Sequence, residues 1–212
     1  MEDSNNNFVI TINRTYGSGG SEIGHKLAKQ LNIPCYDKKL LKSISKDWNY
    51  SEKYLKNFDE HPMKTISYIL SLQSQNVIPF ENIPTQTIDD LFVAQSDLIK
   101  KLVKKHSCVI IGRCANYILE DHPKLFSIFI NSPISNRIKR AGTYNPEIKN
   151  EHNIQKIVNK IDKQRKEYNN EYSDKDWMSM ENYHMCLNSG KLGINSCIEI
   201  IKNYLKQENF IV

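Results

Sequence analysis

The sequence predicts an α/β fold in which a parallel β-sheet is covered by helices on both faces. Three short apolar runs, at residues 8–12, 107–112 and 125–130, have the length and the β-branched content of buried strands. Segments with helical spacing of apolar residues separate these runs, as they do in parallel sheets. The chain has 212 residues, which is enough for one sizeable core or for a core with an inserted subdomain.

The first apolar run leads into a glycine-rich turn and then into an amphipathic helical segment. The turn contains Gly17, Ser18, Gly19, Gly20 and Ser21. Glycines let backbone N–H groups converge, and the unpaired N–H groups and the dipole at the start of a helix attract an anion. The stretch therefore predicts a phosphate-binding loop, and a tight turn without a ligand is the alternative.

This loop matches neither of the common glycine-rich phosphate motifs completely. When G-x-x-x-x-G-K-[ST] is laid over residues 14–21, Arg14 takes the place of the first glycine and Gly20 that of the lysine. The final hydroxyl is present as Ser21. The dinucleotide pattern G-x-G-x-x-G meets Glu22 where it needs its third glycine, which disfavours a dinucleotide oxidoreductase.

The remaining segments continue the alternation of strands and helices. A short strand is expected at 34–37, where Asp37 can cap the following helix. Long amphipathic helices are expected at 87–105, from Pro133, from Ile154 and over 193–207, with a short strand at 183–187.

Two polar stretches interrupt this pattern. Residues 45–85 are irregular, with short helices expected at 52–59 and 63–72. They form either an inserted subdomain or a surface excursion without a role in binding. Residues 142–153 carry a glycine and a proline and suit a flexible cover.

Three arginines in the second half of the chain are candidates for ligand binding. Arg137 and Arg140 are three apart and therefore occupy neighbouring positions on one helix face. Arg165 falls on the apolar side of the next helix, where the spacing calls for an aliphatic residue. It needs a partner there, which is either a ligand at the sheet edge or a structural salt bridge.

Composition favours a cytoplasmic protein with an anionic small-molecule ligand. The 29 Lys and Arg exceed the 24 Asp and Glu by five, without a long basic run that would indicate nucleic acid. The five cysteines are scattered and form no C-x-x-C, as expected for buried reduced thiols. No apolar stretch approaches the roughly 20 residues of a membrane span, and the polar N-terminus is unlike a secretory signal.

Four stretches together resemble the cytidylate kinase-like family, the bacterial relatives of CMP kinase: INRTYGSGGSEIG, PCYDKKLL, VIIGRCANYI and NYHMCLNSGKLGI. The resemblance implies one three-layer P-loop NTPase domain over 1–212 with a five-stranded parallel sheet. It also implies an inserted NMP-binding-like region, here about 45–85, and a lid, here 142–153. The implied cofactors are ATP and Mg²⁺. The implied partner is a small nucleotide or another phosphorylated acceptor, not nucleic acid or a membrane.

The same resemblance implies roles for individual residues. The loop from Gly17 to Ser21 holds the donor phosphates, with Ser21 touching the metal ion. Arg113 binds the acceptor, together with Asp37 and with Asp162 in an Asp-x-x-Arg pair with Arg165. The residues expected to neutralise the transferred group are Arg137, Arg140 and Arg165, and Arg14 is expected to replace the missing lysine in part.

The sequence also departs from the kinase pattern. Besides Gly20 in the lysine position, Glu22 in the first helical turn would compete with a bound phosphate. An Asp-Ser-Gly acceptor motif becomes Asp37-Lys38-Lys39, and a Gly-Arg-Asp triplet becomes Gly112-Arg113-Cys114. Two functions therefore stay open: an ATP-dependent phosphotransferase acting on a CMP-like acceptor, and a non-catalytic nucleotide- or phosphate-binding module.

Overall fold

A computed structural model of the chain describes residues 7–37 and 86–211. The chain divides into two compact units, one formed by Met1–Tyr36 with Leu102–Val212 and the other by Asp37–Lys101. Helix α5 (Gln86–Lys105), predicted at 87–105, begins in the second unit. The insertion at 45–85, the helices at 52–59 and 63–72, and the helix that Asp37 was expected to cap lie outside the described residues.

A five-stranded parallel sheet forms the centre of the first unit, in the order β2-β3-β1-β4-β5. Strand β1 (Val9–Arg14) lies in the middle, with Ile10 opposite Val109 of one neighbour and Phe126 of the other. The other strands are β2 (Cys35–Tyr36), β3 (Cys108–Ile111), β4 (Leu125–Asn131) and β5 (Met185–Asn188). The predicted parallel sheet is therefore confirmed.

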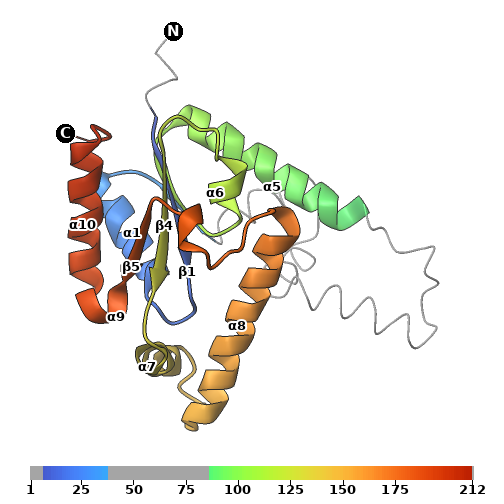
Figure 1. Cartoon of the computed structure of the whole chain (residues 1–212), viewed down its shortest axis with the longest axis vertical. Coiled ribbons are helices and arrows are strands. Elements are labelled where there is room, and N and C mark those ends of the chain that lie inside the picture. The colour runs from blue at the N-terminus through green and yellow to red at the C-terminus, as the bar shows by residue number, and fades with distance from the viewer. Residues whose placement is uncertain (1–6, 38–85, 212) are drawn as a thin grey trace. The chain divides into compact units, whose positions relative to one another are not determined.

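Helices cover both faces of this sheet, which confirms the expected three layers. Figure 1 shows α1 (Gly20–Leu31) and α10 (Ile194–Gln207) on one side of the strands. On the other side lie α6 (Ala115–Ile118) and α8 (Glu151–Tyr172). Helix α7 (Ile134–Tyr144) packs against α8, and the short α9 (Ser189–Leu192) leads from β5 to α10. A 3-10 turn at Met180–Asn182 precedes β5.

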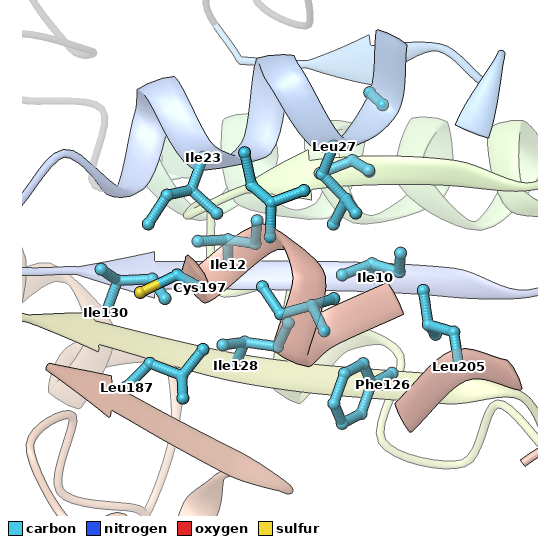
Figure 2. Packing of buried hydrophobic residues seen from close by; sticks show 14 of the residues in the cluster. Ile10, Ile12, Ile23, Leu27, Phe126, Ile128, Ile130, Leu187, Cys197 and Leu205 are labelled. Atoms are coloured by element: carbon cyan, nitrogen blue, oxygen red, sulfur yellow. The ribbon is translucent and has the colours of Figure 1, made fainter. Parts of the chain in front are cut away.

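The apolar core lies between the sheet and the α1–α10 layer. Alternate strand residues face it, including Ile10 and Ile12 of β1 and Ile128 of β4. Figure 2 shows Ile23 and Leu27 of α1 packed over these strand side chains. Burial of this apolar surface fixes α1 against β1, and it thereby fixes the ends of the loop that joins them.

The opposite face of the sheet is more polar. The side chain of Asn13 donates to Asn116 Oδ1 at 2.8 Å, and Thr11 is also buried there. Trp177 packs edge-on against Phe129, with ring centroids 5.4 Å apart, and is only 3% exposed. Trp177 is therefore a core residue.

The polar connection between α7 and α8 is shorter than the sequence predicts. The prediction placed a flexible cover at 142–153, but α7 continues to Tyr144 and α8 begins at Glu151. The side chain of Asn150 accepts the N–H of His152 at 2.9 Å, so it caps α8 earlier than the first apolar residue, Ile154. Gly142 is accommodated inside α7, and only residues 145–150 join the two helices.

Other features agree with the predictions or shift them slightly. The last strand and helix begin at Met185 and Ile194, two residues and one residue later than predicted. All five cysteines are free thiols. Among the described helices, none has the length and apolar content needed to cross a bilayer.

Candidate phosphate-binding site

The glycine loop lies at the carboxyl end of the central strand. Arg14 is the last residue of β1 and Gly20 is the first of α1, so residues 15–19 form the loop. The strands next to β1 are β3 on one side and β4 on the other, and ligands of open α/β sheets bind outside the carboxyl ends of strands at such a point. The first N–H groups of α1, at this end of the helix, have no partners within the helix.

Two glycines give the loop its shape. Gly17 and Gly19 have φ values of 78° and 80°, in the left-handed region that other residues rarely adopt. A Cβ on Gly17 would collide with the backbone carbonyl of Arg137 in α7. A Cβ on Gly19 would lie 2.6 Å from Ile194 Cδ1 and 3.2 Å from Arg140 Cζ. The loop is thus pressed closely between α7 and the start of α10.

Serine hydroxyls hold the loop from inside. Ser18 Oγ donates to the carbonyl of Thr15 at 2.8 Å, so this hydroxyl serves the turn itself. Ser189 Oγ, buried at the end of β5, is hydrogen-bonded to the carbonyl of Ser18 and lies 2.9 Å from that of Asn131. Sequence reasoning gave Ser189 no role, because no local pattern connects it with a residue 171 positions away.

The side chain of Arg14 occupies the space into which a side chain at position 20 would point. A Cβ on Gly20 would lie 2.5 Å from Arg14 Cβ and 3.0 Å from its Cγ. Beyond this stem, the guanidinium of Arg14 lies against Gly112, directly after β3. The positively charged side chain of this loop, Arg14, therefore belongs to the end of β1, where the common motif has a glycine. In the common motif the cation is a lysine at the start of the helix.

Asp162 of α8 joins the loop to α7. Its Oδ1 accepts the N–H of Tyr16 at 2.6 Å, and its Oδ2 forms an ion pair with Nη2 of Arg137. Burial raises the pKa of Asp162, while the Tyr16 N–H and the positive charges of Arg137 and Arg165 offset part of this increase. The sequence expected Asp162 to act with Arg165; in the structure Asp162 forms an ion pair with Arg137, and the charge of Arg165 also acts on its carboxylate.

Arg165 contacts the backbone of the loop region. Its Nη1 donates to the carbonyl of Arg14 at 2.9 Å, and its Cζ lies 5.6 Å from the ring centroid of Tyr16. The sequence analysis left two alternatives for the partner of Arg165, a ligand or a structural salt bridge. The structure adds a third partner that sequence reasoning did not consider, the main-chain carbonyl at the end of β1.

Arg140 lies beside the loop and pairs with the first turn of α1. Its Nη1 lies 2.6 Å from Oε2 of Glu22, whose other oxygen lies 2.7 Å from Nζ of Lys26. Hydrogen bonds from Lys26 and Arg140 lower the pKa of Glu22. Arg137 and Arg140, which lie three residues apart in α7, therefore bind carboxylates on two different helices.

The other predicted site residues are placed as follows. Arg113 has a left-handed backbone, with φ of 65°. It directly follows Gly112, the residue against which the guanidinium of Arg14 lies. Asp37 directly follows β2 and belongs to the second unit. Ser21 lies in the first turn of α1, half-buried. Over residues 7–37 and 86–211, no group of three or more His, Cys, Asp or Glu is arranged to hold a metal ion.

Strand order and loop position together define a P-loop kinase type of α/β fold. A shikimate kinase from Bacteroides thetaiotaomicron has a similar structure, with a TM-score of 0.53 and 12% identity over 94% of this chain and 98% of that chain. A shikimate kinase from Acinetobacter baumannii, solved with shikimate, gives 0.51 and 11% over 96% of each chain. At such identities the likeness concerns the fold alone.

The chain belongs to the cytidylate kinase-like family, whose model matches residues 9–191. A crystal structure of an uncharacterized protein from Eubacterium ventriosum is also similar, with a TM-score of 0.71 and 28% identity over 94% of this chain and 99% of that chain. A search of curated proteins gave no match.

Proposed function

We propose that this protein is an ATP- and Mg²⁺-dependent phosphotransferase that acts on a CMP-like nucleoside monophosphate or another small phosphorylated acceptor. The observation that carries the proposal is the glycine loop at the carboxyl end of β1, with the guanidinium of Arg140 beside Gly19. Family membership and the kinase-type fold support the same class of reaction.

The loop fits a phosphate group in its backbone and its charge. Two left-handed glycines directly before the N-terminus of α1 are backbone features of an anion-binding loop. The hydroxyl of Ser21 in that turn is the group proposed to contact Mg²⁺. When bound, ATP and Mg²⁺ supply the transferable phosphoryl group and the charge that bridges its oxygens.

The protein's own part is to position the two ligands and to neutralise charge. Backbone N–H groups of Gly19, Gly20 and Ser21 are proposed to hold the donor phosphates. Arg140 is proposed to leave Glu22 and bind the transferred group, because its planar guanidinium can contact two phosphate oxygens. The further cations proposed at the transferred group are Arg137 and Arg165, and the proposed acceptor-binding residues are Arg113, Asp37 and Asp162.

Phosphoryl transfer with purified protein tests the proposal. ATP and Mg²⁺ are incubated with a panel of nucleoside monophosphates, and ADP formation is followed for each. We expect transfer to at least one acceptor, a loss of at least about tenfold in Arg140→Met, and no loss in Lys160→Met, whose side chain is exposed on α8. Absence of transfer to every acceptor would argue strongly against the proposal.

A second candidate is a nucleotide- or phosphate-binding module without turnover. The observation that favours it is Gly20, whose neighbouring space is filled by Arg14, so that a lysine does not fit there by itself. Calorimetric titration with ATP and Mg²⁺ separates the candidates, since binding without hydrolysis or transfer supports the module. A gain of transfer in the double variant Arg14→Gly, Gly20→Lys would support it further.

A further inference from the structure

Arg14 and Gly20 form an exchanged pair within the loop. In the common motif, a glycine ends the strand and a lysine starts from the helix. Here an arginine ends the strand and a glycine starts the helix, and the stem of the arginine fills the space that the second side chain would need. The space beside position 20 is therefore still filled, but the positively charged side chain now starts at the end of β1 and not at the first turn of α1.

Because the side chain starts from β1, the guanidinium of Arg14 lies at the end of β3. The side chain of Arg14 runs from the end of β1 toward the end of the neighbouring β3, where its guanidinium lies on the backbone of Gly112. Gly112 has φ of +73°, and a Cβ at this position would collide with Nη1 of Arg14. The absence of a side chain at position 112 therefore makes room for the guanidinium, directly beside Arg113 in the chain.

Charged residues of α7 and α8 lie close to Arg14 at the start of the loop. Its carbonyl accepts Nη1 of Arg165 at 2.9 Å, and the positive charge of Arg14 acts on the Asp162 carboxylate. Asp162 also binds Arg137, which is only 9% exposed. Within the described part of the chain, the buried Nε of Arg137 has no hydrogen-bond partner.

We propose that Arg14 is the phosphate-binding cation of the loop and that it binds the phosphate of the acceptor, at the β3 side, and not the donor phosphates at the start of α1. This inference rests on the proposed function, because it assigns two phosphate groups to one site. The ligand class is a phosphate monoester dianion. A planar guanidinium can hold two of its oxygens, and the guanidinium of Arg14 lies against Gly112, directly after β3.

Binding measurements on variants that keep the stem test this inference. Arg14→Met retains the aliphatic part that packs against Gly20 and removes the charge, and Lys29→Met on the exposed side of α1 is the matched control. Affinities for CMP, for ATP with Mg²⁺ and for inorganic phosphate are measured by calorimetry, and thermal unfolding checks that each variant is folded. We expect Arg14→Met to lower the affinities for CMP and for inorganic phosphate at least about tenfold, and the affinity for ATP less than about threefold.

The outcomes separate the inference from the proposed function. A loss of ATP affinity as large as the loss for CMP would place the cation on the donor and overturn the inference. Unchanged affinities in Arg14→Met, or no binding of phosphate by the wild-type chain, would also overturn it. If the wild-type chain binds inorganic phosphate through Arg14 but binds neither nucleotide, the proposed function fails and the Arg14 phosphate site stands.

Discussion

Nη1 of Arg140 lies 2.6 Å from Oε2 of Glu22, so a cation of α7 is held by an acid in the first turn of α1. The sequence had suggested that Glu22 opposes phosphate binding at this helix end. In the folded chain its charge is shared with Arg140 and Lys26, and the same contact keeps Arg140 beside Gly19. Glu22 is therefore the residue that holds Arg140 next to the loop, and its competition with a bound phosphate stays a prediction.

Replacement of Glu22 by Gln should tighten phosphate binding. The variant removes a negative charge near the helix N-terminus and releases Arg140, so we expect the affinity for inorganic phosphate or ATP to rise about threefold or more. Calorimetry on Glu22→Gln measures this change. Glu199→Gln is the control, since Glu199 pairs only locally with Lys202 on α10. Weaker binding in Glu22→Gln would contradict the competition.

The contribution of Glu22 to stability should depend on pH. Its pKa is lowered in the folded state from its ordinary value of 4.5. The unfolded chain therefore binds the proton more readily, and the stabilisation is present above pH 4.5 and is lost as the pH falls below it. Because both side chains are about a third exposed, we expect no more than about 0.5 kcal/mol. Urea unfolding of wild type and Glu22→Gln between pH 3 and pH 7 checks this, and a difference that grows toward acid pH has the wrong sign.

Asp162→Asn should destabilise the loop region. The carboxylate binds the N–H of Tyr16 and the buried Arg137, so its loss leaves a buried guanidinium without its counter-charge. We expect a loss of about 2–3 kcal/mol in the free energy of unfolding, together with weaker phosphate binding. Asp176→Asn, which removes an exposed partner of Lys166, is the control and should change stability little. Equal effects of the two variants would refute the role of Asp162.

Arg14 and Gly20 should be coupled in stability. Gly20→Ala alone places a methyl group against the Arg14 stem and should cost about 1–3 kcal/mol. In the Arg14→Gly background the two shortest contacts are removed and only Ile130 Cβ stays close, at 3.2 Å, while alanine favours the helix over glycine. A double-mutant cycle followed by urea unfolding should therefore give a coupling of at least about 1 kcal/mol. Additive effects would show that the two positions do not share space.

Thiol labelling should distinguish buried from partly accessible cysteines. Burial raises the pKa of Cys108 and of Cys114 to about 12, so neither forms appreciable thiolate near neutral pH. Cys35 and Cys186 are only half-buried. With iodoacetamide at pH 8, mass spectrometry should find Cys35 and Cys186 modified well before Cys108 and Cys114. Early modification of Cys114 would mean that the region after β3 opens readily.

Much of the site could be located from local patterns. The apolar run that becomes β1, the glycines at 17 and 19, and the amphipathic α1 identified the loop, because each of these features depends on neighbours in sequence. The same reasoning placed Arg137 and Arg140 on one face of a helix. Local patterns set the wrong limits for the cover at 142–153, since the Asn150 cap outweighed the polar composition.

The sequence by itself determined the α/β class, the glycine loop and the set of charged residues near it, since backbone preference and hydrophobic spacing are local properties. Only the tertiary structure decided which charges meet: Asp162 with Arg137, Arg140 with Glu22, and Arg14 with the backbone at Gly112. These pairings join residues that are far apart in the chain, and they follow from how α7 and α8 pack and from which strands neighbour β1. The exchange between Arg14 and Gly20 became a physical relationship only when one side chain was seen to fill the space of the other.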